Sequence, residues 1–210
     1  MKISPGQKVG ICGRTGSGKS SLLSTLLRLL DLDSGSIVID GQDLSTLPRE
    51  VVRTRMIAIP QDPFILSEST RLNADPGGKV SDDKIIAALT KVNLWSVIEP
   101  RGGLDENMKS QPLSHGQQQL FCLARAMLRT SKILILDEAT SNVDRETDQL
   151  MQRIIREEFQ GHTIITVAHR LDTIEDSDMV AVLDAGALVE FGNPKALLAK
   201  DSFFKSLHGR

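Results

Sequence analysis

Along most of the chain, short runs of apolar residues alternate with longer stretches in which apolar positions recur at helical spacing. Short apolar runs between turn residues predict buried strands, and the longer periodic stretches predict amphipathic helices. Strands are predicted at 8–12, 36–40, 56–60, 132–136, 163–167 and 179–183. Helices are predicted at about 19–30, 81–92, 115–129 and 145–159, with one or two short ones in 194–208. This alternation favours an α/β fold with a mostly parallel sheet.

The middle of the chain breaks the alternation. From about 62 to 129 no apolar run predicts a strand, while helical patterns continue. A length of 210 residues suits one domain with a single core, and no internal repeat or low-complexity linker divides it. We therefore expect one domain, 1–210, with a helical subdomain inserted at about 62–129.

The charge balance limits the kinds of partner that the chain is expected to bind, and the cysteines indicate its cellular compartment. The chain has 25 Lys and Arg residues and 27 Asp and Glu residues, which gives a formal net charge of −2. There is no excess of basic residues that would favour binding to nucleic acid or to a membrane surface. No apolar run reaches the roughly 18 residues of a membrane span, and the N-terminal residues lack the apolar core of a signal peptide. Cys12 and Cys122 form no C-x-x-C pair, so we expect buried, reduced thiols in a cytosolic compartment.

The most specific motif lies between the first predicted strand and the first predicted helix. Gly13 to Ser20 read Gly-Arg-Thr-Gly-Ser-Gly-Lys-Ser, which matches the phosphate-binding pattern G-x-x-x-x-G-K-[ST]. Glycines let backbone N–H groups curl around a β-phosphate, Lys19 adds a positive charge, and Ser20 is placed to ligate Mg²⁺. The alternative is a glycine-rich surface turn. The strand before the loop and the helix after it favour the binding of a nucleoside triphosphate instead.

A pair of carboxylates follows the strand predicted at 132–136. Ligands of open α/β sheets bind at the carboxyl ends of the strands, where Asp137 and Glu138 are expected. Asp137 would hold Mg²⁺ directly or through water, and Glu138 can face an attacking water, as phosphoryl transfer requires. The alternative is that these acids complement the dipole of a following helix. The upstream phosphate-binding loop makes that the weaker interpretation.

Leu113-Ser-His-Gly-Gln117 opens the helix predicted at 115–129. A serine and a glycine at a helix start offer a hydroxyl and uncovered N–H groups to an anion. Taken alone, however, these five residues are better explained as an ordinary helix cap.

The order and spacing of the motifs carry more information than any one of them. The phosphate-binding loop, Gln61 after a predicted strand, Leu113–Gln117, Asp137-Glu138, Ser141-Asn-Val-Asp144 and His169 follow one another as in ATP-binding cassette proteins. The chain resembles that family over essentially its whole length. It is most similar to the second nucleotide-binding domain of the C subfamily, the multidrug-resistance-associated exporters. This similarity rests on Val-Gly-Ile-Cys at 9–12 together with the loop, Ile-Pro-Gln-Asp-Pro at 59–63, Cys-Leu-Ala-Arg-Ala at 122–126 and Leu-Asp-Glu-Ala-Thr-Ser-Asn-Val-Asp at 136–144.

The resemblance implies a P-loop NTPase core with a mostly parallel sheet, a partial antiparallel β part and the inserted helical subdomain. It implies that ATP is bound by Gly13, Arg14, Thr15, Gly16, Ser17, Gly18, Lys19, Ser20, Ser21 and Gln61. It also implies Mg²⁺ bound by Ser20, Gln61 and Asp137, with Glu138 as the general base and His169 on the γ-phosphate. Gln61 would link the Mg²⁺ and the water to the helical insert and to a membrane domain.

Members of the family pair head to tail, so the resemblance places two further segments at a partner's nucleotide. The signature residues Ser114, His115, Gly116 and Gln117 would close on ATP bound by a second nucleotide-binding domain of the same parent chain. Asp144 would lie at the dimer seam. His169 has an alternative interpretation as a satisfied polar residue after a buried strand, and for His162 the structural interpretation is the better one.

Two departures from the family pattern modify this expectation. Family domains carry antiparallel strands and an adenine-stacking aromatic before the phosphate-binding loop, whereas here no aromatic precedes Phe64, so we expect a fragment or a truncated gene product. His115 stands where the signature usually has Gly, and Gln118 stands where a basic residue is common. A side chain at His115 would crowd the partner's γ-phosphate and weaken that composite site.

We therefore expect an ATPase domain of an ABC transporter, which couples the hydrolysis of MgATP to ADP and phosphate with export across a membrane. As an isolated fragment it is expected to be a weak ATPase. Its partners would be a second nucleotide-binding domain and transmembrane domains at the cytosolic face of the membrane, with no nucleic acid. The alternatives are a non-catalytic nucleotide-binding module and a soluble cassette ATPase of chromosomes or ribosomes. The absence of a heptad segment between Gln61 and Leu113 argues against the chromosome type.

Overall fold

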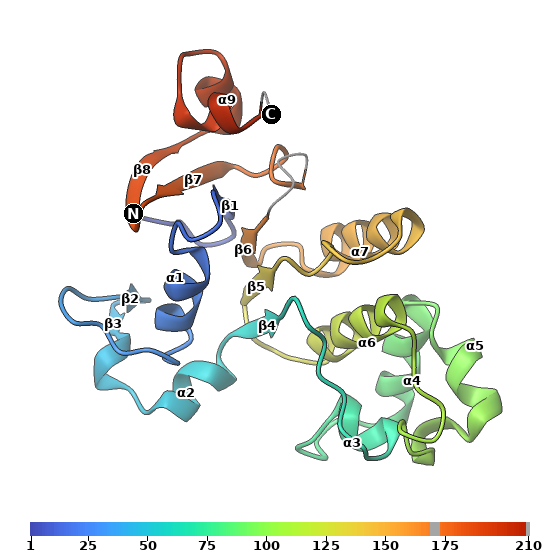
Figure 1. The fold of residues 1–210 in the computed structure, drawn as a ribbon. Coiled ribbons are helices and arrows are strands. Elements are labelled where there is room, and N and C mark those ends of the chain that lie inside the picture. The colour runs from blue at the N-terminus through green and yellow to red at the C-terminus, as the bar shows by residue number, and fades with distance from the viewer. Residues whose placement is uncertain (169–172, 209–210) are drawn as a thin grey trace. The chain divides into compact units, whose positions relative to one another are not determined.

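The computed structural model of the protein describes residues 1–168 and 173–208 (Figure 1). The chain divides into two compact units. The sheet unit comprises Met1–Ala58, Ser131–Glu138 and Gly161–Arg210, and the helical unit comprises Ile59–Thr130 and Ala139–Gln160. The predicted boundaries of the helical subdomain, about 62–129, stay a prediction.

Within the described residues, six strands form one sheet in the order β4-β5-β6-β1-β7-β8. They are β1 (Lys8–Gly13), β4 (Ile57–Ile59), β5 (Ile133–Asp137), β6 (Thr163–Val167), β7 (Met179–Asp184) and β8 (Ala187–Gly192). Strands β5, β6, β1 and β7 pair in parallel, and β8 pairs antiparallel to β7. A separate antiparallel pair is formed by β2 (Val38–Ile39) and β3 (Gln42–Asp43). The predicted mixed α/β fold with a mostly parallel sheet is confirmed.

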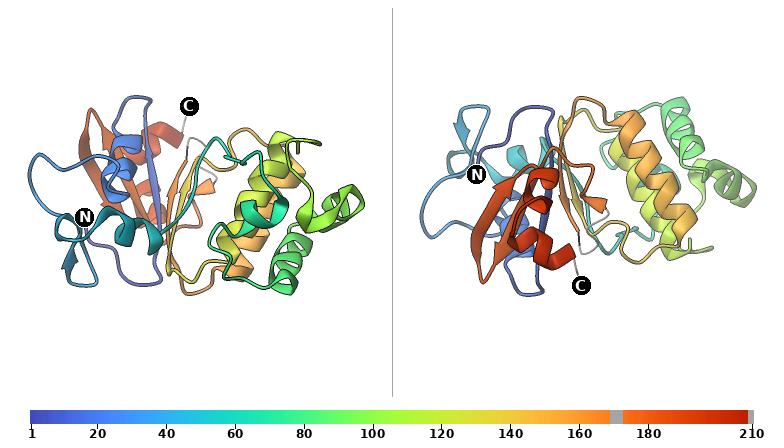
Figure 2. Two further views of the ribbon diagram at one scale, coloured as in Figure 1. Left: turned by 90° about the horizontal axis from the view of Figure 1, so that it is seen from below. Right: turned by 90° about the horizontal axis from the view of Figure 1, so that it is seen from above.

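The central strands are apolar because both faces of the sheet are buried. Side chains alternate between the faces, so Ile11 and Ala181 enter one core while Cys12 and Val182 enter the other. The first core packs against helices α1 (Lys19–Leu26) and α2 (Arg49–Thr54) and the turn η1 (Leu44–Thr46). The second packs against α8 (Pro194–Leu198) and α9 (Phe203–His208), shown in red in Figure 2. This burial fixes the register of the strands whose ends carry the predicted site.

Helix α1 is shorter than the sequence predicted, because it ends at Leu26 and not near residue 30. Arg28 adopts a left-handed conformation with φ 51°, and the N–H groups of Arg28 and Leu29 bond back to carbonyls of the preceding turn. This is the Schellman arrangement that ends many helices, here with an arginine where glycine is usual. The Arg28 guanidinium donates hydrogen bonds to three carbonyls of the segment 44–47, which holds the helix end in place.

Strand β8 was missed by the sequence analysis. Its hairpin with β7 turns at Ala185 and Gly186, with φ of 46° and 81°, the backbone signs of a type I′ turn. The apolar Leu188 and Val189 on this strand are partly exposed, so no clean alternation of apolar and polar residues marks it. Since β8 is the last strand in the sheet order, it needs no second buried face.

The helical unit contains the segment in which no strand was predicted, and the structure has none in the region 62–129. Its helices are α3 (Thr70–Ala74), α4 (Asp82–Lys91), α5 (Trp95–Ile98), η2 (Glu99–Arg101), η3 (Gly103–Asp105), α6 (His115–Met127) and α7 (Arg145–Glu158). Helix α6 contacts both α4 and α7, as Figure 1 shows, and buries Phe121 and Leu123 completely. No helix within the described residues combines the length and the apolar character needed to cross a bilayer.

Candidate functional site

The predicted phosphate-binding loop connects β1 to α1 in the sheet unit. Gly13, Gly16 and Gly18 have φ of 151°, 79° and 100°, values that side-chain-bearing residues rarely adopt. At Gly13 an added Cβ would lie 2.2 Å from the carbonyl oxygen of Leu183, so only glycine fits at this position. The loop therefore curls tightly, which is the geometry that a phosphate group requires of backbone N–H groups.

Lys19 closes the loop from the first turn of α1. Its side chain is buried, and Nζ donates to the carbonyl oxygens of Gly13, at 2.9 Å, and Arg14, at 3.2 Å. The hydroxyl of Ser17 is also buried and has no hydrogen-bond partner among the described residues. Ser20 and Ser21 are exposed at the helix start. The loop thus combines a buried ammonium group with free hydroxyl oxygens at a helix N-terminus, a suitable arrangement for an anion and its counter-cation.

The strand register brings the two predicted carboxylates to the same edge of the sheet as the loop. Asp137, the last residue of β5, pairs with Val167 of β6, which in turn pairs with Ile11 of β1. The backbone N–H of Glu138 donates to the carbonyl of Val167 at 3.0 Å and so continues this row. Because all three strands are parallel, Asp137 and Glu138 lie at the carboxyl edge where β1 delivers the loop.

The surroundings of Asp137 combine burial with charge. Burial raises the pKa of its carboxyl, the neighbouring Glu138 raises it further, and the Lys19 ammonium lowers it. Lys19 is therefore within electrostatic reach of Asp137. One carboxylate, one serine hydroxyl and the oxygens of a triphosphate form the oxygen-rich ligand set that Mg²⁺ prefers. Asp137 and Ser20 fit that ion.

Glu138 has a strained backbone. Its φ of 51° is in the left-handed region, where L-residues other than Asn and Asp are uncommon. Such outliers cluster at functional sites, where the surrounding structure enforces them.

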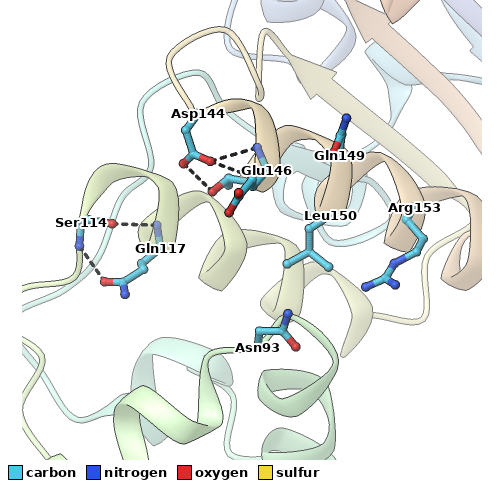
Figure 3. A pocket seen from close by; sticks show the side chains of 9 residues that line it. Asn93, Ser114, Gln117, Asp144, Glu146, Gln149, Leu150 and Arg153 are labelled. Atoms are coloured by element: carbon cyan, nitrogen blue, oxygen red, sulfur yellow. Dashed lines mark hydrogen bonds between the residues drawn. The ribbon is translucent and has the colours of Figure 1, made fainter.

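The signature residues lie on the helical unit. Ser114 is the N-cap of α6, and its hydroxyl accepts the N–H of Gln117 at 3.3 Å, while the Gln117 side chain accepts the N–H of Ser114 at 3.0 Å (Figure 3). This reciprocal pair is a capping box. His115 is exposed at the first turn, and Gly116 is half-buried. The cap interpretation of Ser114 and Gln117 therefore describes their contacts within this chain.

Asp144 caps the neighbouring helix of the same unit. One of its oxygens accepts the N–H groups of Glu146 and Thr147, and the other accepts the Thr147 hydroxyl at 2.7 Å (Figure 3). These hydrogen bonds hold the pKa of Asp144 below its usual range. A Cβ added at Gly116 would lie 3.3 Å from the Thr147 hydroxyl oxygen and 3.6 Å from Asp144 Oδ2, so glycine lets α6 approach this cap.

These two caps share a pocket of about 740 Å³ (Figure 3). Its lining consists of Asn93, Ser114, Gln117, Asp144, Glu146, Thr147, Gln149, Leu150 and Arg153. The structure therefore brings the predicted signature and dimer-seam residues to one place on the helical unit.

Two predicted residues remain to be located. Gln61 belongs to the helical unit, where its backbone carbonyl accepts a 2.6 Å hydrogen bond from Gln119. His169 lies outside the described residues.

Thr147 and Gln119 were missed by the sequence analysis. For Gln119 a signal was available, because a glutamine directly before an apolar helical run indicates a buried polar group.

Comparison with known proteins identifies the family. The model of the ABC transporter family matches residues 1–141. This chain belongs to the ABC transporter family. It is an ATP-binding domain of the family, and such domains are ATPases.

Relatives match this ABC transporter domain over almost its whole length. It is 53% identical over 209 residues to "ABC multidrug transporter B" of Aspergillus fumigatus, covering 99% of the chain and 14% of that protein. It is 49% identical over 208 residues to "ATP-binding cassette sub-family C member 2" of Rattus norvegicus, covering 96% of the chain and 13% of that protein. The chain thus spans 13–14% of the length of these curated relatives.

A solved structure has the same fold. The bacterial Atm1-family ABC exporter with ATP bound superposes with a TM-score of 0.90 at 32% sequence identity, covering 99% of this chain and 37% of that one. The predicted resemblance to nucleotide-binding domains of ABC transporters, including the C subfamily, is confirmed.

Proposed function

We propose that this ABC transporter domain binds MgATP at the Gly13–Ser20 loop and hydrolyses it with Glu138 as general base, coupling hydrolysis to export across a membrane. The observation that carries the proposal is the strand register. It puts Asp137 and Glu138 at the carboxyl edge of the sheet that also delivers the loop and Lys19.

The proposed roles follow from the chemistry of each group. The loop N–H groups and Lys19 bind the phosphates. Ser20, Asp137 and Gln61 would hold Mg²⁺, which would supply positive charge to the phosphates. Glu138 accepts a proton from the attacking water, a role that contributes about 10²–10⁴-fold in enzymes. His169 would contact the γ-phosphate beside that water.

We propose a second nucleotide-binding domain as the partner of the signature residues. Ser114, His115, Gly116 and Gln117 would close on the ATP of that partner, with Asp144 at the seam. The pocket that gathers Ser114, Gln117 and Asp144 supports this role, because one partner surface could contact all three. The names of the relatives, a multidrug transporter and an ABC exporter, support the export function.

A transmembrane domain is the second proposed partner, with this domain on the cytosolic face. An apolar surface downstream of Gln61 supports it, since Phe64 is 66% exposed and Leu66 is 37% exposed. The fully buried Asn73 accepts the N–H of Leu66 at 2.7 Å and donates to its carbonyl at 3.0 Å, so the backbone of the segment is anchored at Leu66. Exposed apolar side chains beside an anchored backbone suit a protein contact.

Glu138→Gln tests the proposed chemistry. The amide fills the same space but cannot accept a proton, so we expect unchanged ATP binding and a loss of turnover of at least about 100-fold. Glu157→Gln, at an exposed glutamate of α7, is the matched control and should turn over ATP like the parent. Binding is measured with labelled ATP, and turnover by phosphate release at increasing protein concentration.

The outcome separates the proposal from its alternative. Equal turnover in Glu138→Gln and the parent would exclude Glu138 as the base. A two-domain protein that binds ATP at this site without turnover would instead favour a non-catalytic module.

A further inference from the structure

Gln119 is a buried polar residue in the middle of an apolar helical surface. It lies on α6 just before Leu120 and Phe121, and only 1% of it is exposed. Large polar side chains are seldom buried this deeply unless their hydrogen bonds serve a specific purpose.

The Gln119 side chain reaches the segment that carries Gln61. Its Nε2 donates to the carbonyl oxygen of Gln61 at 2.6 Å and to that of Pro60 at 3.1 Å. These two acceptors fix the orientation of the amide, because a flipped amide would place Oε1 against two carbonyl oxygens. All three residues belong to the helical unit, so these contacts lie within one compact body.

The oxygen end of the amide is unfavourable at this position. Its Oε1 is buried and has no hydrogen-bond partner among the described residues. A buried acceptor without a donor is unfavourable, and an apolar side chain of the same length would avoid it. The two carbonyl contacts must therefore offset that disadvantage.

We propose that Gln119 is a positioning residue for Gln61. By holding both carbonyls where the chain leaves β4, it fixes the backbone from which the Gln61 side chain would reach a bound Mg²⁺. The same helix begins at the Ser114–Gln117 capping box, so Gln119 also ties Gln61 to the signature segment. The inference rests on the proposed role of Gln61 in binding Mg²⁺.

The test measures how strongly Mg²⁺ enhances ATP binding. The readout is the ratio of the ATP dissociation constant in EDTA to that in excess Mg²⁺, determined with labelled ATP for the 210-residue chain. Gln119→Met keeps the length of the side chain and removes the two donors. Gln152→Met is the matched control, because the half-buried Gln152 donates its hydrogen bond to Asp148 within its own helix and so lies away from Gln61 in the contacts it makes.

We expect Gln119→Met to lower the ratio about tenfold, the lower end of the effect of outer partners on metal sites, and to leave the constant in EDTA unchanged. Gln61→Ala should lower the ratio as well, and the double variant should fall no further than Gln61→Ala alone, since both changes act through one side chain. Gln152→Met should keep the parent ratio. A merely structural role would weaken binding in EDTA and in Mg²⁺ alike.

Each contrary outcome has a distinct meaning. A parent ratio of one would overturn the Mg²⁺ site and this inference together. If Gln61→Ala lowers the ratio but Gln119→Met keeps the parent ratio, only the inference is overturned. Fully additive effects in the double variant would also overturn the inference alone. If Gln119→Met does not fold, Gln119→Asn serves instead, because its amide is one methylene too short to hold both carbonyls and the same ratios apply.

Discussion

Replacing Gly13 by alanine tests the geometry of the phosphate-binding loop directly. The new methyl group would lie 2.2 Å from the carbonyl oxygen of Leu183 and 2.6 Å from the hydroxyl oxygen of Ser17. The first contact is with the backbone of β7, which pairs with Gly13 in the sheet and cannot move away cheaply. Gly16→Ala is the matched control, because nothing lies within 4 Å of its added Cβ although its φ is also positive.

The two variants should differ in the free energy of unfolding. At Gly13, the positive φ costs about 1–3 kcal/mol for alanine and the overpacking about 1–3 kcal/mol more, a total of about 2–6 kcal/mol. At Gly16 only a conformational cost of about 1–2 kcal/mol applies. Since domains are stable by about 5–15 kcal/mol, Gly13→Ala should be severely destabilised or unfolded.

Urea denaturation of the 210-residue chain measures the difference. With a slope of about 2–3 kcal/mol per molar urea, Gly13→Ala should shift the midpoint down by about 0.7–3 M, more than Gly16→Ala. Any folded Gly13→Ala protein should also bind ATP more weakly, because relief of the clash displaces the loop N–H groups. Equal midpoints for the two variants would refute the argument from the Leu183 contact.

Three further variants test separate features. His115→Gly should raise ATP turnover at the composite site that this signature closes, measured in a two-domain protein whose other site is silenced; an unchanged or lower rate would mean that His115 does not crowd the nucleotide. Thr147→Val removes the hydroxyl that donates a hydrogen bond to Asp144, so the pKa of Asp144 should rise toward its ordinary value, whereas Thr147→Ser should keep it low. NMR titration measures this pKa. The stabilisation from this depressed pKa is present above the unfolded-state pKa and is lost as the pH falls through the folded-state pKa, so only Thr147→Val should weaken the acid dependence of unfolding. Glu138→Gly should abolish ATP turnover. It should unfold at the same urea concentration as the parent or a slightly higher one, because glycine relieves the left-handed strain by about 0.5–1 kcal/mol net. Marked destabilisation would contradict the assignment of strain.

The periodicity of the sequence predicted most of the sheet, because strands buried on both faces consist of short apolar runs. It failed where local backbone geometry decided the outcome. The apolar run through Leu30 looked helical, but the left-handed turn at Arg28 ends α1, and its anchoring carbonyls at 44–47 lie far along the chain. Strand β8 was missed since an edge strand with exposed Leu188 shows no clear alternation.

For the site, the motifs predicted which residues gather at the sheet edge, because the carboxyl ends of parallel strands share one edge. Residue motifs could not predict the supporting contacts. Thr147 supports Asp144 within the cap of its own helix. Gln119 donates to the carbonyls of Pro60 and Gln61, far along the chain, and this pairing depends on how α6 packs within the unit. Spacing along the sequence carries no record of that packing.

Backbone strain singles out Glu138 among the residues of the site. Five non-glycine residues in the described part of the chain have a positive φ: Arg28, Asp40, Asn93, Glu138 and Ala185. Four of these have a local explanation. Arg28 and Asn93 end helices α1 and α4, where N–H groups bond back to carbonyls of the last turn. Asp40 and Ala185 occupy hairpin turns and are each followed by glycine.

Glu138 belongs to neither group. It follows a parallel strand, and its N–H continues the ladder to Val167. A glycine or asparagine would adopt this conformation at lower cost, so the conformation does not favour glutamate. Its carboxylate also stands next to Asp137, whose pKa it raises, which adds repulsion at a half-buried position. The backbone strain and the repulsion therefore support the proposal that this carboxylate activates water, at the edge that carries Lys19 and the phosphate-binding loop.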